Sequence, residues 1–405
     1  MKQPVVWRRL RGLVSLLFPL YFLFFSSCSP RHPGASDNSL VNGFLYRMFN
    51  TYDPSNFLAN VGRTIAPPLF ANLKTQTANL VTQGTTLASS CTAGNLTNFQ
   101  NAWLANIAAA KQVEIFHFGP FVTYYPLFDA WPGEAMKTVS PESPPSAGDM
   151  DSLDFDYTGT YGASVAGATS YIGTLDKDAK GLIAIEYVAF IKPGSYGANQ
   201  EACSDLTSIR LNLLQALIAD YASNANALAN AWDPTGTTKY GEQLATAGKG
   251  STTYSYSGAA LNDVFSGALR QLSTMKDGKL EKPAGLSNGG NGVINLSLSE
   301  SRLSGNSVVN LRNNLASFKA LYLGNGAVGL SDYIRYYSPS LDTRAKSDIT
   351  QLETVLNSFS NISSANMSSI SQSVALLSDL LNVLNVQFPA VLGNGPVSSS
   401  GGDGD

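Results

Sequence analysis

The most unusual charged residue of this 405-residue chain is Glu186. It lies in residues 182–191, LIAIEYVAFI, a segment that would be apolar on every face of a helix apart from Glu186 itself. A helix that is apolar all round is expected to be buried, and an ionised carboxylate there is costly unless cations or hydrogen-bond donors meet it. Glu186 therefore needs a partner, and the sequence leaves open a bound metal, several hydroxyl groups or an arginine. The candidate arginines are Arg210, Arg270 and Arg312.

The chain has few histidines that could bind a metal or take part in catalysis. It has two histidines, His32 and His117, so a zinc site built from several histidines cannot be assembled within the fold. The sequence contains no nucleophile elbow, phosphate-binding loop or dinucleotide fingerprint. His117 stands between Phe116 and Phe118, which favours a packed histidine at a helix end over a member of a catalytic triad.

One acidic cluster could serve a hard cation such as calcium or iron(III). It consists of Asp149, Asp151, Asp154 and Asp156. The cluster lacks the glycine and the distant glutamate of a calcium-binding loop, so a solvated acidic loop is the preferred interpretation.

The N-terminus has the pattern of a bacterial lipoprotein signal peptide. A basic segment is followed by a mostly apolar run at residues 13–25, and Ser26 and Ser27 then precede Cys28. The run has the length of a signal-peptide core and is short for a membrane span. We predict that residues 1–27 are removed and that Cys28 carries a lipid, which would anchor the chain in the envelope, on the periplasmic face of the outer membrane or on the cell surface. An ordinary secretory cleavage nearby is the alternative.

Charge limits the partners of the mature chain. The net charge is −3, and removal of Lys2, Arg8, Arg9 and Arg11 with the leader changes it to −7. Only 14% of the residues are charged, against about 25% in typical domains. These values argue against nucleic acid and anionic membrane surfaces as partners. After the leader we expect no further membrane-spanning segment.

The remaining cysteines suggest a covalent link. If Cys28 carries lipid, Cys91 and Cys203 are the two left of three. An isolated pair in an oxidising envelope predicts one disulfide, which would close a loop of over a hundred residues. Two buried free thiols are the alternative.

Helical periodicity dominates the apolar parts of the sequence. Ile370, Val374, Leu377, Leu381 and Leu384, for example, repeat at steps of four and three. No convincing run of alternating strand residues is present, so we predict an all-α fold. The expected helices are residues 52–82 with a bend at Pro67-Pro68, 99–114, 176–191, 206–232, 261–275 stopping at Asp277-Gly278, 308–322, 343–359 and 370–388.

The polar stretch at residues 235–255 predicts a boundary between two helical bundles packed side by side. The expected parts are a signal peptide at 1–27, a flexible tether at 28–44, an N-terminal bundle at 45–240, a C-terminal bundle at 255–390 and a disordered tail at 391–405.

Several short stretches resemble the motifs of the imelysin family, in the family's order. Residues 181–187, GLIAIEY, resemble its signature G-x-H-x-x-E followed by tyrosine. The other stretches are AWL at 102–104 with EIFHFGP at 114–120, AWP at 130–132, KLEKPAGL at 279–286, and ESRLSGNS at 300–307 ahead of Leu321-Tyr322. The resemblance covers residues 45–390.

This resemblance implies an exported protein of two helical bundles, linked to iron acquisition or, in the founding member, to peptide cleavage. It places the signature histidine and glutamate one helical turn apart, facing one spot between the bundles. Ile183 stands at the histidine position here, which leaves Glu186 as the signature metal ligand and Glu114 as a second candidate. His117 stands at the position of the family's arginine. A zinc-bound water needs about three protein ligands, so we expect no peptidase activity and weak or no binding of iron or another divalent metal.

The sequence therefore predicts an imelysin-like envelope lipoprotein with a non-catalytic binding role related to iron acquisition. A surface lipoprotein that binds a protein partner without metal, and a metallopeptidase, remain the alternatives.

Overall fold

The computed structural model describes residues 52–129, 163–175, 180–190 and 202–392. The chain separates into a unit at residues 1–52 and a unit from Asp53 onward, and the second is described here by itself. The predicted signal peptide, Cys28, the tether, His32, the AWP stretch, the acidic cluster Asp149, Asp151, Asp154 and Asp156, and the tail from residue 393 lie outside the described residues. Within those residues every regular element is a helix, as predicted.

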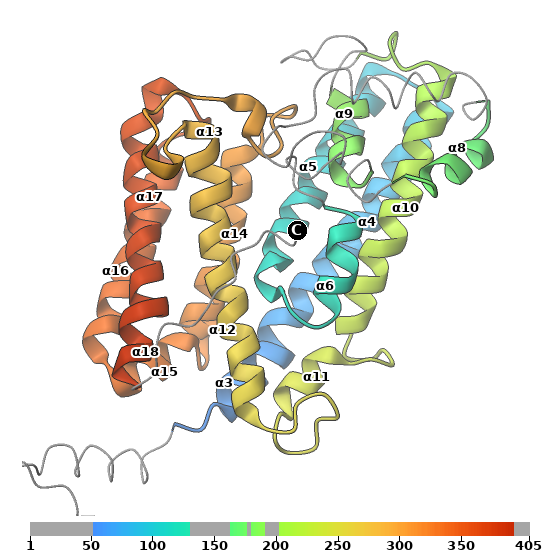
Figure 1. Cartoon of the computed structure of the whole chain (residues 1–405). Helices are drawn as coiled ribbons and strands as arrows, with labels where there is room; N and C mark the ends of the chain where they lie inside the picture. The colour runs from blue at the N-terminus through green and yellow to red at the C-terminus, as the bar shows by residue number, and fades with distance from the viewer. Residues whose placement is uncertain (1–51, 130–162, 176–179, 191–201, 393–405) are drawn as a thin grey trace, which may run out of the picture. The chain divides into compact units, whose positions relative to one another are not determined.

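The helices of the first half pack around a long central helix (Figure 1). This helix, α4, packs against both α5 and α10, while α8 covers α10 and α9 packs on α5 and α10. Trp103, Tyr221 and Trp232 fill the interior between them. The main helices are α3 (Ser55–Asn60), α4 (Ala66–Ser89), α5 (Ala93–Val113), α6 (Pro120–Tyr124), α8 (Val165–Ile172), α9 (Leu182–Phe190), α10 (Ser208–Trp232) and α11 (Tyr240–Ala245).

The helices of the second half form a further group in Figure 1. Here α16 packs against α17 and α14, and α12 packs against α17. The two groups meet where α14 contacts α5, while the domain boundary at 235–255 stays a prediction. These helices are α12 (Ser257–Ser273), α13 (Lys282–Ala284), α14 (Ser307–Leu323), α15 (Leu330–Tyr337), α16 (Pro339–Asn357), α17 (Met367–Asn382) and α18 (Phe388–Val391).

The predicted bend at Pro67-Pro68 stays a prediction, whereas the predicted end of this helix near residue 82 is wrong. Both prolines lie in the first turn of α4. The segment just before α4 is a π-helix, η1 (Val61–Ile65). Helix α4 then continues to Ser89, beyond the predicted end at residue 82.

The predicted stop at Asp277-Gly278 is also wrong. Helix α12 continues into a π-helix, η6 (Thr274–Glu281), and the helical path ends only at Gly285, which has φ +67°. A glycine inside a helix costs about 1 kcal/mol, a loss that burial of Met275 and Leu280 outweighs. A π-helical segment is rare and often marks a functional site.

The helix predicted over 176–191 is shorter among the described residues, because Gly181 interrupts it. Gly181 has φ +76°, and a Cβ there would lie 2.4 Å from the carbonyl oxygen of Phe128. Leu182 donates its N–H to that same oxygen at 2.8 Å. This close approach starts α9 at Leu182 and fixes the position of the signature stretch.

The predicted disulfide is confirmed. Cys91, just before α5, is bonded to Cys203, in the turn before α10.

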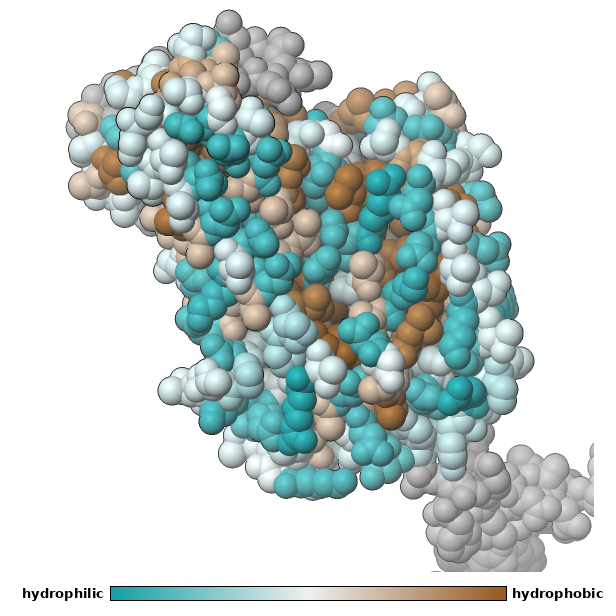
Figure 2. Space-filling model, turned by 180° about the vertical axis from the view of Figure 1, so that it is seen from behind, coloured by the Kyte–Doolittle hydropathy of each residue, from teal (hydrophilic) through white to brown (hydrophobic). Residues whose placement is uncertain are grey.

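One described helical stretch passes a length and composition test for crossing a membrane, against our expectation of none. It runs from Ser364 to Val391, with a mean hydropathy of 1.4 in its most apolar window. A core helix of a soluble protein passes the same test, and this stretch packs on α12 and α16 through α17. On the face shown in Figure 2, hydrophobic residues lie interspersed among hydrophilic ones, as on ordinary protein surfaces.

Candidate functional site

Stretches that resemble family motifs lie far apart in the sequence and meet in the structure. Trp103 donates its indole N–H to the carbonyl oxygen of Leu182 at 3.1 Å. Ser304 donates its backbone N–H to Glu186 Oε1 at 2.8 Å. The Nζ atom of Lys279 lies 2.8 Å from Glu114 Oε2. These contacts define one buried polar region, built from both groups of helices.

The centre of this region is the ammonium group of Lys111, whose side chain is 2% exposed. Lys111 lies on the last turn of α5. Its Nζ atom is 2.7 Å from Glu114 Oε1 and 2.8 Å from Glu300 Oε1, and it also contacts Asp129 Oδ2. The Tyr125 hydroxyl lies 3.3 Å away. Three carboxyl groups therefore meet the three N–H donors of a single ammonium.

A second buried ammonium, that of Lys279, shares two of these carboxylates. The π-helix η6 carries it inward, where Nζ lies 2.8 Å from Asn314 Oδ1 and 3.3 Å from Glu300 Oε1, besides its contact with Glu114. We call this set the Lys111 network. Its members are Lys111, Glu114, Tyr125, Asp129, Lys279, Glu300 and Asn314.

Glu114 has all its acceptor positions occupied. Oε1 accepts from Lys111 and from the Tyr125 hydroxyl at 2.6 Å, and Oε2 accepts from Lys279 and from Asn314 Nδ2 at 2.5 Å. An ionised carboxylate offers about four lone-pair positions. A metal could therefore bind Glu114 only by displacing a donor of the network.

The network sets the ionisation of its members. Burial disfavours the charged form of Glu114, but the ammonium groups of Lys111 and Lys279 outweigh it and hold the pKa of this carboxyl well below its usual value. Burial likewise opposes the charge on Lys111, yet Asp129, Glu114 and Glu300 raise its pKa well above the ordinary value. We therefore assign both groups as charged at neutral pH.

Asp129 behaves differently from Glu114. Burial, together with repulsion from Glu114 and Glu300, raises the pKa of Asp129 despite the attraction of Lys111. Tyr125 contacts both Asp129 Oδ2 and Glu114 Oε1 through its hydroxyl. A hydroxyl has one proton to donate, so a proton on Asp129 would allow both contacts to be hydrogen bonds.

Glu186 has a less generous set of donors. Its side chain is buried in α9 and accepts a hydrogen bond from the N–H of Ser304. The Ser304 side chain and Arg302 also favour its charged form, so a hydroxyl and an arginine do act on it, but this arginine is not one of the three named from the sequence. Burial raises the pKa of Glu186 to about 7, against hydrogen bonding from Ser304 and the attraction of Arg302.

The three arginines expected as partners of Glu186 act elsewhere. Arg210 lies over the Tyr187 ring, 5.8 Å from its centroid. Arg312 donates to the carbonyl oxygens of Leu356 and Phe359. Burial and the positive charge of Arg270 together lower the pKa of His117 to about 4.

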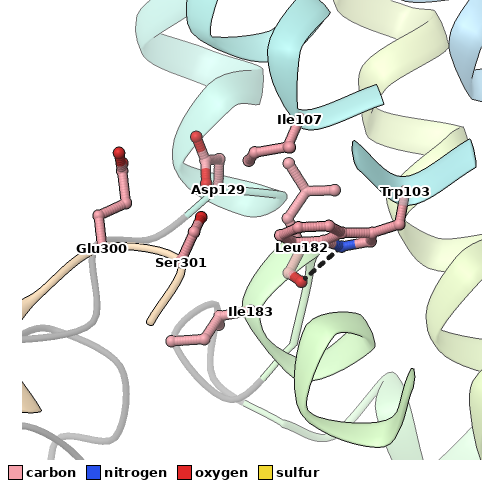
Figure 3. A pocket seen from close by; sticks show the side chains of 7 residues that line it. All are labelled: Trp103, Ile107, Asp129, Leu182, Ile183, Glu300 and Ser301. Carbon is pink, nitrogen blue, oxygen red and sulfur yellow. Dashed lines mark hydrogen bonds between the residues drawn. The ribbon is translucent and has the colours of Figure 1, made fainter. Parts of the chain in front are cut away.

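A small pocket adjoins the Lys111 network (Figure 3). Its volume is about 10 Å³, room for about one water molecule and far less than the several hundred Å³ of a typical small-molecule site. Figure 3 shows Asp129, Glu300 and Ser301 on one side and Trp103 on the other. The lining residues are Trp103, Ile107, Asp129, Leu182, Ile183, Glu300 and Ser301.

Ser301 lines this pocket with an unusual backbone, at φ +46°. Such left-handed conformations cost about 1–3 kcal/mol for residues other than glycine, and they concentrate at functional sites. Asn310 Nδ2 fixes the turn by donating to Ser301 Oγ at 2.9 Å and to Glu300 Oε2 at 3.0 Å. The strained turn presents Glu300 to the two lysines.

The sequence profile of the imelysin family matches residues 66–387, most of the chain. The chain belongs to the imelysin family. A search of curated proteins finds no significant match.

Two solved structures share the imelysin fold of this chain. One is a putative iron-regulated protein A precursor from Parabacteroides distasonis, with a TM-score of 0.64 and 17% identity over 82% of this chain and 92% of that one. The other is an imelysin-like protein from Psychrobacter arcticum, with a TM-score of 0.63 and 13% identity over 85% of this chain and 98% of that one.

The metal that the imelysin resemblance suggests does not fit the described residues. Among them, no group of three histidine, cysteine, aspartate or glutamate side chains is arranged to hold an ion. Ile183 lines the pocket with an alkyl group, and Glu114 has no acceptor position to spare. Glu186 is the signature carboxylate that remains, and burial raises its pKa to about 7, so its neutral form is favoured below pH 7.

His117 is a packed side chain at the end of the 3-10 helix η2 (Glu114–Phe116), as the sequence predicted. Its ring lies 5.0 Å from that of Phe121, centroid to centroid. Burial and Arg270 keep it neutral at pH 7.

Sequence reasoning singled out Glu114 and Glu186 but missed most of the Lys111 network. One signal was available for Lys111, which lies four residues after Ile107 and thus on the apolar face of α5. Lys279 and Glu300 were seen within motif-like stretches without being assigned a role. The residues not identified as part of the site are Lys111, Tyr125, Asp129, Lys279, Glu300 and Asn314.

Proposed function

We propose that this chain is a non-catalytic, lipid-anchored binding protein of the bacterial envelope with a role related to iron acquisition. Its family supports an envelope role, and one structural neighbour is described as an iron-regulated protein A precursor. The observation that carries the non-catalytic part is the pairing of Ile183 with Glu186 on α9. These two residues stand where the resemblance places the histidine and glutamate of the signature.

The geometry argues that iron itself is not held at this signature site. A hydrolytic or transport metal needs about three protein ligands. The alkyl side chain of Ile183 supplies none, and the acceptor positions of Glu114 are taken by Lys111, Lys279, Tyr125 and Asn314. The chain would then contribute to iron acquisition by binding another component of the envelope.

Calorimetric titration with zinc and iron(II) tests the proposal. The parent should show no binding tighter than about 1 mM, near the limit of about 4 kcal/mol expected for a single carboxylate contact. No cleavage of a protein substrate should accompany either metal. Ile183→His restores the signature pair and should strengthen binding at least tenfold, and the matched control Ile183→Leu should not. Micromolar binding by the parent that Glu186→Gln abolishes would overturn the proposal.

The anchor has its own test. Cys28 follows a leader-like apolar run and two serines, so a Cys28→Ala protein should lose its lipid and move from the membrane to the soluble fraction. Mass spectrometry of the parent's mature N-terminus should show a diacylglycerol-modified cysteine. A free N-terminus at another position would contradict the lipid anchor.

A further inference from the structure

A pair of carboxyl groups joins two neighbouring helices of the second half, α16 and α17, which pack side by side (Figure 1). Asp348 on α16 forms a side-chain hydrogen bond with Asp379 on α17. An ionised carboxylate offers acceptors only, so two carboxyl groups can form a hydrogen bond only while one of them carries a proton. The contact between the two helices therefore includes a shared proton.

The position of Arg344 decides which carboxyl group holds this proton. Arg344 lies one helical turn before Asp348 on α16, and it donates to both oxygen atoms of Asp379, from Nε to Oδ2 at 2.6 Å and from Nη2 to Oδ1. Asp348 is 7% exposed, and its Oδ2 atom is buried with no hydrogen-bond donor among the described residues. Asp379 is therefore the ionised member of the pair, and Asp348 is the member that holds the proton.

The pKa values of the two carboxyl groups agree with this assignment. Burial and the neighbouring Asp379 raise the pKa of Asp348 from 3.8 to about 6, against the attraction of Arg344. Hydrogen bonding from Arg344, supported by Asp348, lowers the pKa of Asp379 despite its burial. Between pH 5 and pH 8, the proton that this pair can lose is thus the one on Asp348.

Other charged groups on the described helices packed against α16 and α17 have partners of their own. On α14, the hydroxyl of Tyr322 donates to Asp342 at 3.1 Å, and burial and Asp342 raise the pKa of Tyr322, so it stays neutral in this range. On η11 (Val383–Gln387), the uncharged Gln387 lies 3.4 Å from Arg344 Nη1. The pairs not described above are Asp342 with Lys346, Asp332 with Arg335, Lys319 with Glu353, Asp263 with Tyr254, and Lys276 with Asp277 and Glu281.

We propose that Asp348 and Asp379 form a proton-operated latch between α16 and α17, which is closed while Asp348 holds its proton and loosens when that proton is lost. Loss of the proton places two carboxylates against each other beside one guanidinium, and Asp348 becomes a buried charge with an unpaired oxygen. This inference goes beyond the proposed function and depends on neither the lipid anchor nor a binding partner.

The size of the pH effect follows from the pKa of Asp348. Because this pKa is higher in the closed latch than in a free aspartate, the stabilisation is complete below about pH 4 and is lost as the pH rises through about 6. A shift of about two pKa units makes the opening equilibrium constant rise about tenfold between pH 5 and pH 8. Asp379 contributes with the opposite sign, and its stabilisation is lost only on further acidification.

Hydrogen–deuterium exchange of the purified full chain, read by mass spectrometry at pH 5 and pH 8 and corrected for intrinsic exchange rates, tests the proposal. Amides of α16 and α17 should lose about tenfold in protection from pH 5 to pH 8, relative to those of α4. Helix α4 is the internal reference because Lys74 is its one titratable residue. An equal change in α4, or no change in α16 and α17, would overturn the proposal.

Asp348→Asn is the deciding variant, because an amide of nearly the same shape cannot ionise and can donate to Asp379 at every pH. Its protection in α16 and α17 should be the same at pH 5 and pH 8. The matched control is Glu353→Gln, which lies on the same helix and should keep the pH dependence of the parent. A dependence that persists in Asp348→Asn would contradict the latch. If Asp348→Asn does not fold, the comparison of α16 and α17 with α4 in the parent still decides.

Discussion

Glu114 and Glu186 are both glutamates of motif-like stretches, and both lie in the interior. Glu114 accepts four hydrogen bonds, two of them from ammonium groups. Glu186 accepts a hydrogen bond from the N–H of Ser304, and the charge of Arg302 attracts it more weakly. Their pKa values consequently move in opposite directions, down for Glu114 and up to about 7 for Glu186.

The difference shows that burial by itself does not decide the state of a carboxyl group. Desolvation is the largest single influence on both glutamates and acts in the same direction. The two ammonium groups beside Glu114 reverse the effect of burial, whereas Ser304 and the more weakly acting Arg302 do not reverse it at Glu186. Glu114 therefore acts as a charged clamp between the helix groups, and Glu186 as a proton-holding group in α9.

The largest expected effect is that of Glu114→Gln. The substitution leaves Lys111 and Lys279 short of a buried counter-charge, and we expect it to lower the free energy of unfolding by about 3–5 kcal/mol. Urea denaturation at pH 7.5 measures it. The control is Glu353→Gln, which breaks a pair with Lys319 that is roughly half exposed, and should cost at most about 1 kcal/mol. Equal losses of unfolding free energy in the two variants would contradict the assignment of Glu114 as a charged clamp between the helix groups.

A smaller, pH-dependent effect is expected for Glu186→Gln. Because the folded-state pKa of Glu186 is raised from 4.5 to about 7, the native state holds a proton that the unfolded state releases earlier. The parent therefore loses stability as pH rises from about 4.5 to about 7, by up to about 3 kcal/mol. Glutamine never ionises and still accepts from Ser304.

Unfolding free energies of the parent and Glu186→Gln between pH 5 and pH 9 check this expectation. The two proteins should differ by about 1 kcal/mol or less at pH 5, and the variant should become the more stable one above pH 7. A difference that stays constant across this range would show that Glu186 does not titrate there, and would make it resemble Glu114.

Periodicity and composition were enough to predict the all-helical fold and the disulfide. The interior position of Glu186 also followed, because no face of residues 182–191 is polar. The burial of Lys279 could not be predicted, because the local sequence signals the end of a helix just before it. A glycine beside an aspartate ordinarily ends a helix. The helical path here continues past Gly278 as a π-helix, which turns the following side chains in different directions from those of an α-helix.

Asp129 and Glu300 were beyond prediction for a different reason. Both lie outside the long helices, Asp129 after η3 (Tyr125–Leu127) and Glu300 in the turn before α14. Their side-chain directions depend on local backbone geometry, such as the positive φ of Ser301, and no repeating pattern encodes it. A resemblance to family motifs could mark the stretch around Glu300 but not its contact with Lys111.

The bond between Cys91 and Cys203 makes a covalent ring of the chain between them, across a sequence separation of 112. Lys111, Glu114, Asp129 and Glu186 all belong to this ring, whereas Lys279 and Glu300 lie outside it. In the chain-entropy description, closing a loop of this size removes disorder from the unfolded chain worth about 5 kcal/mol. An oxidised chain thus begins folding with Lys111, Glu114 and Asp129 of the Lys111 network already restricted in space by the disulfide. A reduced chain must bring these residues together by packing alone. The redox state of the compartment in which the chain folds would in this way govern how readily its two halves find each other.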